Sequence, residues 1–225
     1  MENISNRVYK NNGNPVVLNE IHNFTNSNPK ILDIGCGNGD VARNLNNLNY
    51  IIDGITISEQ EAINSRNVMR NVFIYNLENG LPLDLLEEKY DIIICSHVLE
   101  HICYPSNLLR DIKNILSDRG ILIVCLPNLL HYKSRLELLK GNFHSSELGG
   151  IWDSTHFKWY TFKTGQELLE KSSFIVKSKY VTGEMPFGIL FKWVPSKIKN
   201  KVFSILIKIS KGFFGDQLVY IAKLS

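Results

Sequence analysis

The sequence has no apolar run long enough to cross a bilayer. No stretch of about 18 consecutive apolar residues occurs in its 225 positions, whereas a membrane-spanning helix needs about 20. The N-terminal segment is polar and rich in asparagine, and it lacks the apolar stretch of a secretory signal peptide. We therefore expect no transmembrane helix and a cytoplasmic protein.

Cysteine is scarce, and its spacing offers no metal site. No two of the cysteines have the CxxC spacing of zinc and redox motifs, and no cluster of histidine with cysteine suggests zinc. We expect no bound metal and interpret the cysteines as free thiols in a reducing compartment. They are Cys36, Cys95, Cys103 and Cys125.

Neither sign of charge dominates. With 25 basic and 22 acidic side chains, the net charge is +3, which gives no electrostatic reason to expect nucleic acid as a partner. Hydrophobic residues make up 44% of the chain, enough for the core of one α/β domain. Because there is no internal repeat and no obvious linker, we interpret residues 1–225 as a single domain.

Strand-like and helix-like segments alternate along residues 28–126. This alternation predicts a mostly parallel sheet covered by helices on both faces, and right-handed crossovers make the sheet doubly wound. A short helix, Val16–Phe24, is expected before it. The expected strands are Lys30–Ile34, Tyr50–Ile55, Asn71–Tyr75, Tyr90–Cys95 and Ile121–Leu126, and the expected helices are Asp40–Leu48, Ser58 to near Arg70, and Pro105 to near Ser117.

Residues 127–225 are less regular. We interpret them as the second half of the domain, with a helical insertion near residues 186–212. The expected elements are the helices His131–Lys140 and Thr164–Lys171, the strands Ile175–Val181 and Leu218–Lys223, and a polar and aromatic loop over residues 141–160.

A glycine-rich turn follows the first expected strand. Asp33, Gly35, Gly37 and Gly39 give the pattern Asp-x-Gly-x-Gly-x-Gly. Glycine lets a ligand lie against bare main chain, and in a doubly wound sheet this turn is where an adenosyl cofactor lies. A dinucleotide site would have GxGxxG spacing, so a nicotinamide-dependent oxidoreductase is the weaker alternative. The intact glycines also favour an active enzyme over a catalytically silent scaffold of the same fold.

This turn, together with segments 90–101 and 116–122, resembles the class I S-adenosylmethionine-dependent methyltransferases. Residues 116–122 are similar to the family's L-x-x-G-G-x-L entry to strand five, with Arg119 in place of the first glycine. The resemblance implies a Rossmann-like, seven-stranded, mostly parallel sheet with an antiparallel last strand and a C-terminal lid. It also implies S-adenosylmethionine as cofactor, bound by residues 28–126, and a small-molecule or saccharide acceptor, bound by residues 127–225 and methylated at oxygen or nitrogen. Segments 127–128, 141–143 and 153–157 resemble a bacterial subgroup similar to methionine-biosynthesis protein W and glycan-associated methyltransferases.

The resemblance implies which residues bind the cofactor. The glycine turn lines the methionine end with an acid behind it, residues after the third strand contact the adenine, and the end of the fourth strand forms the floor near the sulfonium. In that order, these residues are Gly35, Cys36, Gly37 and Asp33; Asn76 and Leu77; and Ser96.

The ribose position departs from the family pattern. At the end of the second strand, most members carry an acid that binds both ribose hydroxyls, and this chain has Thr56. We expect Thr56 to make one hydrogen bond to the ribose and Glu61, one helical turn further on, to supply another. A neutral hydrogen bond has roughly half the strength of a charge-assisted one, so weaker ribose binding is the expected consequence.

Two histidines are the candidate catalytic residues. A hydroxyl acceptor needs a base with a pKa near the working pH, and histidine suits this role. We predict that His156 and His97 contact the acceptor or take its proton, and Asp153 is a further candidate. Glu100 and His101 are interpreted as architectural, because family members with different acceptors share them.

The stretch 186–212 is amphipathic, with interleaved apolar and lysine residues. It is interpreted as a lid or oligomer helix that packs its apolar stripe on the domain. Peripheral contact with a membrane surface is the alternative. The oligomeric state is left open.

Overall fold

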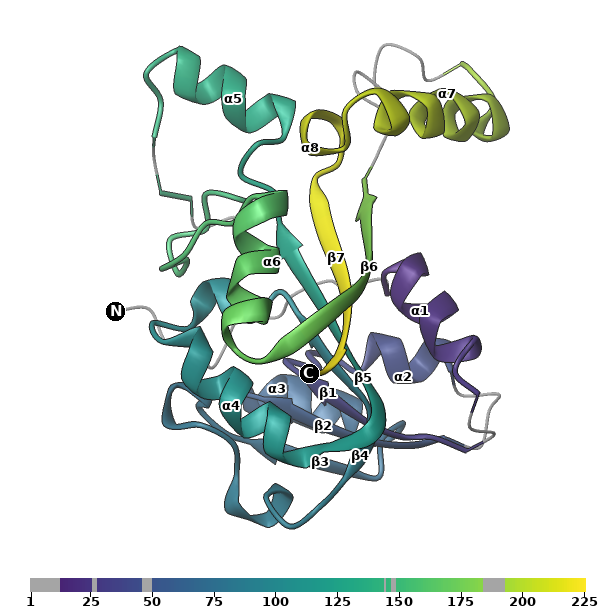
Figure 1. Ribbon diagram of the computed structural model, residues 1–225, viewed down its shortest axis with the longest axis vertical. Helices are drawn as coiled ribbons and strands as arrows, with labels where there is room; N and C mark the ends of the chain where they lie inside the picture. The colour runs from purple at the N-terminus through teal and green to yellow at the C-terminus, as the bar shows by residue number, and fades with distance from the viewer. Residues whose placement is uncertain (1–12, 26–27, 46–49, 144, 147–148, 184–192) are drawn as a thin grey trace.

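The computed structural model of the chain describes residues 13–25, 28–45, 50–143, 145–146, 149–183 and 193–225. Seven strands form one sheet in the order β3-β2-β1-β4-β5-β7-β6 (Figure 1). Strands β1 to β5 are parallel, and β7 is antiparallel to both β5 and β6. The expected doubly wound, mostly parallel α/β fold is therefore confirmed. The strands are β1 Lys30–Ile34, β2 Ile51–Thr56, β3 Asn71–Ile74, β4 Tyr90–Ser96, β5 Leu116–Pro127, β6 Phe174–Thr182 and β7 Gln217–Leu224.

Helices cover both faces of the sheet (Figure 1). Residues of α1 and α2 belong to one buried cluster, and residues of α4 and α6 belong to the other. The helices are α1 Pro15–His22, α2 Asp40–Asn44, α3 Glu59–Ser65, α4 Pro105–Ile115, α5 Tyr132–Leu139, α6 Phe162–Lys171, α7 Ser196–Ile209 and α8 Lys211–Phe214, with short 3-10 helices η2 Leu77–Asn79, η3 Leu83–Leu85 and η4 Leu99–His101.

The central strands are buried on both faces. In β4, Ile92 and Ile94 pack into the cluster with α1 and α2, whereas Ile93 and Cys95 pack into the cluster with α4 and α6. Successive side chains of a strand point to opposite faces, so a continuous apolar run is what a strand between two helical layers requires. This burial fixes the carboxyl ends of β1 and β4 beside each other.

The end of α3 differs from the sequence prediction. The helix ends at Ser65 rather than near Arg70, because Arg70 is already held against β2. Its N–H donates to the carbonyl of Ile52 at 2.7 Å, and its guanidinium pairs with the buried Asp53 carboxylate. Residues 46–49, which include the end of the expected helix after the glycine turn, lie outside the described residues.

The junction between α4 and β5 also differs. The helix ends at Ile115, and β5 begins at Leu116 rather than Ile121. Leu116 already pairs with Tyr90 of β4, ahead of a shift in register. The strand is therefore longer than its apolar run, because Leu116 is paired with β4 and buried in the core ahead of that run.

The predicted insertion contains α7 and α8, which lie at the opposite end of the molecule from β3 (Figure 1). No described residue of α7 is buried, and Ile198, Ile205 and Ile209 are 53%, 51% and 73% exposed. Among the described residues, these three isoleucines are therefore not packed on the domain as expected. Residues 186–192 of the stretch lie outside the described residues. Among the helices that the structure describes, none has both the length and the apolar character needed to span a membrane.

Candidate active site

The turn between β1 and α2 leaves main chain open to a ligand. Gly35 and Gly37 have φ angles of 75° and 51°, a left-handed conformation that glycine adopts without strain. A Cβ on Gly35 would come within 2.4 Å of Val98 Cγ2, so this glycine lets the turn after β4 pack closely. Among the described residues, a Cβ on Gly37 would meet only the Glu61 carboxylate, 3.7 Å from Oε1. Gly37 therefore borders open space in front of Glu61.

Cys36 contributes main chain to this turn rather than its thiol. Its side chain is buried and faces β2, where a Cβ on Gly54 would lie 2.7 Å from Cys36 Sγ. Burial raises the pKa of the thiol, so it stays neutral at ordinary pH. The N–H groups of Gly35 and Cys36 both donate to the carbonyl of Ile55 at 2.9 Å, which fixes the turn against β2.

Asp33 places a buried carboxyl group behind the turn. It lies in β1 and is 2% exposed. Burial, and then the negative charge of Asp40, raises the pKa of Asp33 to about 7. A nearby positive charge favours the ionised form of such a group. The position therefore suits a ligand that carries positive charge.

Thr56 and Glu61 form one hydrogen-bonded unit between β2 and α3. Thr56 Oγ1 donates to Glu61 Oε2 at 2.7 Å and accepts from the N–H of Ser58 at 3.2 Å. Both residues of the pair are 4% exposed. The hydroxyl proton of Thr56 is thus committed to Glu61, and the carboxylate beside Gly37 is the group with capacity to accept hydrogen bonds from two neighbouring hydroxyls.

Asn76 and Leu77 follow β3 at the same edge of the sheet. Asn76 is exposed, and its side-chain oxygen accepts from the N–H of Glu78 at 3.1 Å, which caps η2. Its amide nitrogen is a donor that a ligand can use. Leu77 is half-buried against the core.

The turn after β4 carries Ser96 and His97. Ser96 is 9% exposed and pairs with Cys125 of β5. His97 has φ of 57°, unusual for a residue other than glycine, and strained backbone of this kind clusters at functional sites. Its Nδ1 lies 3.2 Å from Glu100 Oε1. Burial alone would lower the pKa of His97, but the hydrogen bond to Glu100 and the negative charges of Glu100 and Asp216 together outweigh burial and raise it.

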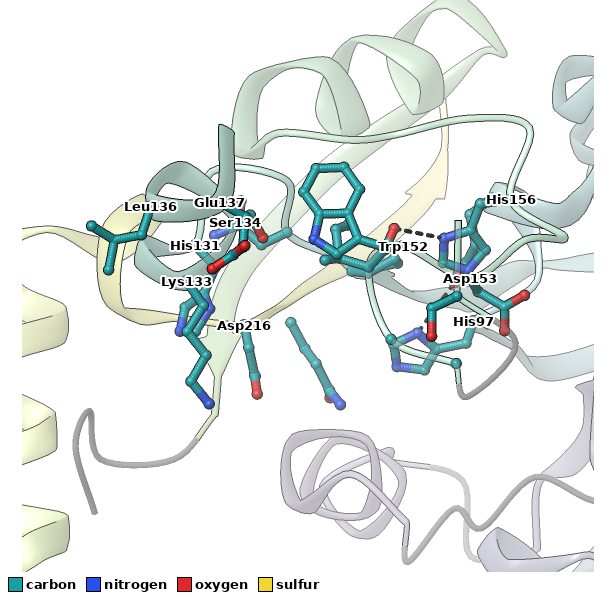
Figure 2. Close-up of a pocket in the computed structure, with 18 of the residues that line it drawn as sticks. His97, His131, Lys133, Ser134, Leu136, Glu137, Trp152, Asp153, His156 and Asp216 are labelled. Atoms are coloured by element: carbon teal, nitrogen blue, oxygen red, sulfur yellow. Dashed lines mark hydrogen bonds and ion pairs between the residues drawn. The ribbon is translucent and has the colours of Figure 1, made fainter. Parts of the chain in front are cut away.

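A cavity of about 750 Å³ opens beside this turn. Its walls come from the turn after β4, from α5, from residues 149–153 and 156, and from the start of β7. Figure 2 shows His97 and His156 near one end, with His131 and Lys133 at the other. The described glycine turn does not line this cavity. Ser96 and His97 lie between the glycine turn and the cavity.

His156 lies in the irregular segment that covers the cavity. Its Nδ1 lies 3.2 Å from the carbonyl oxygen of Ile151, the contact dashed in Figure 2. The same carbonyl accepts from Trp159 Nε1 at 3.0 Å. With Nδ1 as the donor, Nε2 keeps its lone pair. Burial, and then the neighbouring His101, lowers the pKa of His156, which favours the neutral ring.

Glu100 and His101 connect the turn to this covering segment. The main-chain carbonyl of Glu100 accepts from the N–H of Phe157 at 2.8 Å. His101 Nδ1 lies 2.8 Å from Thr155 Oγ1, and the rings of His101 and His156 meet edge to face with centroids 4.5 Å apart. The fold thus brings both predicted catalytic histidines, His97 and His156, to one end of the cavity.

The cavity is also lined by residues that the sequence analysis did not single out. They are His131, Lys133 and Glu137 of α5 and its N-cap, and Asp216 and Gln217 at the start of β7. Burial, and then Lys133, lowers the pKa of His131 to about 4. No local pattern marks these residues, because only the packing of α5 beside the start of β7 brings them together.

Sequence comparison identifies related enzymes. A family profile described as a methyltransferase domain matches residues 14–171, more than half of the chain. The ubiquinone biosynthesis O-methyltransferase of Glaesserella parasuis serovar 5 (strain SH0165) is 30% identical over 125 residues, which cover 51% of this chain and 53% of that enzyme. The chain thus spans about half the length of that relative. The enzyme of the same description from Shewanella sp. (strain ANA-3) is 22% identical over 195 residues, 81% of this chain and 79% of that enzyme.

Solved structures share the fold. A SAM-dependent methyltransferase from Archaeoglobus fulgidus has a TM-score of 0.66 and 19% identity, covering 92% of this chain and 91% of that chain. Magnesium protoporphyrin IX methyltransferase from Synechocystis PCC 6803, solved with bound SAH, has a TM-score of 0.60 and 15% identity, covering 93% of this chain and 80% of that chain.

The residues present fit S-adenosylmethionine. Asp33 offers a buried carboxyl group to a positively charged ligand, Gly37 offers bare main chain, and Glu61 offers an acceptor for neighbouring hydroxyls. The chain therefore belongs to the methyltransferase-domain family and is a class I S-adenosylmethionine-dependent methyltransferase.

Proposed function

We propose that this enzyme transfers the methyl group to a hydroxyl oxygen of a small molecule bound in the cavity. The observation that carries the proposal is the position of the cavity, at the carboxyl end of β4, where the turn with Ser96 and His97 separates it from the glycine turn. Two relatives named as O-methyltransferases support oxygen as the methylated atom.

An aromatic hydroxyl compound is the acceptor class we favour. Trp152 lines the cavity, and Phe143 packs edge-on against it with ring centroids 5.0 Å apart. An aromatic wall of this kind stacks on planar rings. A glycan hydroxyl, the acceptor of the subgroup that the sequence resembles, is the second candidate, because Trp152 stands beside the polar groups of Asp153 and Glu137 in the same cavity (Figure 2).

We assign the cofactor to five side-chain and main-chain groups. Asp33 balances the positive charge of its methionine end across the bare main chain of the turn. Glu61, oriented by Thr56, accepts from the ribose hydroxyls. The amide of Asn76 and the backbone N–H of Leu77 contact the adenine. The bound cofactor supplies a methyl group that its sulfonium has already activated.

His97 and His156 act on the acceptor. As the hydroxyl oxygen forms its bond to the methyl carbon and the carbon–sulfur bond breaks, the hydroxyl proton moves to an imidazole. The lone pair on His156 Nε2 suits this role, because Nδ1 is engaged with Ile151. Holding the oxygen in line with the carbon–sulfur bond supplies several kcal/mol of barrier lowering.

Methyl transfer to a panel of phenols, catechols, sugars and amines, followed by mass spectrometry, tests this proposal. We expect methylated product from a hydroxyl compound, and a drop in turnover of about two to four orders of magnitude in His156→Ala, the range for a general base. His22→Ala, an exposed histidine of α1, is the matched control. Product from amines alone would overturn the assignment to oxygen.

We also propose that α7 and α8 rest on an anionic membrane surface. Lysines and exposed apolar side chains share these helices, and no acidic residue occurs between Ser196 and Phe214. Basic amphipathic helices bind the headgroup region of anionic bilayers. The exposed apolar residues are Ile198, Ile205 and Ile209, and the lysines are Lys197, Lys199, Lys201, Lys208 and Lys211.

Sedimentation with phosphatidylglycerol vesicles tests the membrane proposal. We expect the protein to pellet with these vesicles and to stay in solution with phosphatidylcholine vesicles or at high salt. Ile205→Asp should weaken binding, whereas Ile63→Asp, at a similarly exposed isoleucine of α3, should not. The proposal would be contradicted if both variants lost vesicle binding equally, or if the protein pelleted to the same extent with anionic and neutral vesicles.

A further inference from the structure

A carboxylate and two imidazoles meet in the wall of the cavity. One ligand atom each from Glu100, His101 and His156 lies within 4.8 Å of the others. Glu100 and His101 belong to η4, whereas His156 belongs to the covering segment, so only the fold brings the three together. We propose that they bind a divalent transition-metal ion, with zinc preferred.

Glu100 brings an unused oxygen to this cluster. The residue is fully buried, at 0% exposed. Its Oε1 lies 3.2 Å from His97 Nδ1, whereas Oε2 has no hydrogen-bond partner among the described residues. A buried polar oxygen without a hydrogen-bond partner is unfavourable. A cation bound by Glu100 supplies the interaction that the protein does not.

Both histidines are oriented as metal ligands are. Thr155 Oγ1 donates to Asp153 Oδ1 at 2.6 Å, so it accepts from His101 Nδ1 at 2.8 Å. His156 Nδ1 donates to the carbonyl of Ile151 at 3.2 Å. Metal-binding histidines characteristically donate their other ring N–H to a fixed acceptor. Each ring therefore has a lone pair on Nε2 available for a cation.

The donor set selects the ion. Two imidazoles and one carboxylate are the ligands of catalytic zinc sites, which keep a further position open. Magnesium prefers oxygen ligands and keeps several waters, so two imidazoles disfavour it. Ligand atoms on one zinc ion lie about 3.3 Å apart, so zinc draws this cluster together by moving the covering segment that carries His156.

The role of the ion rests on the proposed function, although its binding does not. All three ligands line the acceptor cavity, so an open coordination position can take the acceptor hydroxyl. A bound zinc ion lowers the pKa of a coordinated hydroxyl group. In the zinc-bound protein, His156 Nε2 is a ligand and no longer the base proposed above, so the hydroxyl proton passes instead to His97, which Glu100 holds through its other oxygen.

Calorimetric titration of the chelator-treated protein with zinc chloride tests the site. We expect one zinc ion per chain, and a loss of affinity greater than about 100-fold in His101→Ala and in His156→Ala, because even removing a residue that supports a ligand costs about 10- to 100-fold. Thr155→Val should cost about tenfold on the same basis. His22→Ala is the matched surface histidine and should bind as the wild type does. Circular dichroism verifies folding of each variant.

Cobalt(II) gives a second measurement that is independent of activity. The cobalt-loaded protein should show visible absorption from nitrogen ligation, and His156→Ala should lose it. No zinc binding, or binding and cobalt absorption unchanged in both histidine variants, overturns the inference. If the protein transfers methyl groups but binds no zinc, the metal site is overturned and the proposed function stands. If it binds zinc but methylates no hydroxyl compound, the proposed function is overturned and the metal site stands.

Discussion

At the scale of single residues, three buried acidic side chains provide the proposed binding groups of this site. Asp33, Glu61 and Glu100 are 2%, 4% and 0% exposed, and each lies where we assign a ligand: the charged end of the cofactor, the ribose, and a metal ion. Acids are rarely buried unless something compensates them. Sequence reasoning named all three, but it treated Glu61 as a supplement to Thr56 and Glu100 as architecture, because hydrogen bonding between side chains is not visible in a motif.

Gly37→Val should abolish cofactor binding. The φ of Gly37 is left-handed, and a side chain there would enter the space in front of Glu61. We expect no S-adenosylhomocysteine binding by calorimetry in a variant whose circular dichroism is unchanged. Gly141→Val is the matched control, since Gly141 has φ of 78° and nothing within 4 Å of a Cβ. Equal loss in both variants would trace the effect to backbone strain rather than to the site.

Glu61→Gln should weaken S-adenosylhomocysteine binding by about 10- to 100-fold, because hydrogen bonds to a charged acceptor are worth about 1.5–3 kcal/mol. Thr56→Val should have a smaller effect, since Thr56 only orients the carboxylate. Glu59→Gln, on the exposed side of the same helix, serves as the control for charge. If Thr56→Val were the more damaging change, the direct ribose contact would belong to Thr56.

Affinity for S-adenosylmethionine should rise with pH through Asp33. In the ligand-free protein, burial and then Asp40 raise the pKa of Asp33 to about 7, so the carboxyl group is mostly neutral below that pH and charged above it. A positively charged ligand binds the charged form better. We expect calorimetric affinity to improve about tenfold between pH 6 and pH 8, following proton linkage, and this dependence to disappear in Asp33→Asn. The same slope in both proteins would contradict the assignment.

The raised pKa of Asp33 makes the ligand-free protein less stable as the pH rises, whereas cofactor affinity should increase. An acid whose folded-state pKa lies above its unfolded value of about 3.9 binds its proton more tightly when folded. The free energy of unfolding of the ligand-free protein therefore falls as the pH rises towards 7.

At the scale of elements, local sequence patterns predicted the central strands more accurately than the points where other elements begin and end. Strands β1 and β4 match the expected ranges to within one residue, since a continuous apolar run is a local signal. The end of α3 and the start of β5 depend on contacts of Arg70 and Leu116 with strands that are distant in sequence. A local sequence pattern does not reveal such contacts. For α7, the pattern gave the amphipathic stripe but could not say what covers it.

Arg70→Ala should destabilise the edge of the sheet. The fully buried Asp53 accepts from Arg70 Nε at 2.9 Å and from the Tyr90 hydroxyl at 2.8 Å. Burial alone would raise the pKa of Asp53, but Arg70 and Tyr90 outweigh it and lower it. We expect a loss of about 2 kcal/mol in urea unfolding, below the roughly 3–5 kcal/mol of fully buried pairs, because the Arg70 side chain is 41% exposed. Arg66→Ala, an exposed arginine after α3, should cost little; equal losses would contradict this account.

At the scale of the whole molecule, the cavity is built by segments that are distant in sequence. The turn after β4, the covering segment and the start of β7 contribute His97, His156 and Asp216 to one space (Figure 2). The two histidines were predicted separately, each from its position after a strand. The sequence pattern does not show that His101 lies beside His156. The end of the cavity near Lys133 has no sequence signal, because it forms only when α5 packs in place.

The central claim is that the cofactor binds at the glycine turn with its reactive end at the histidine-lined cavity. A crystal structure of the complex with S-adenosylhomocysteine tests it most directly. We predict ribose hydroxyls on Glu61, and the sulfur beside Ser96, with His97 and His156 close enough for an acceptor oxygen to bridge the gap. The claim would be contradicted by a sulfur more than about 10 Å from both histidines, since a base must come within hydrogen-bond reach of the reacting group.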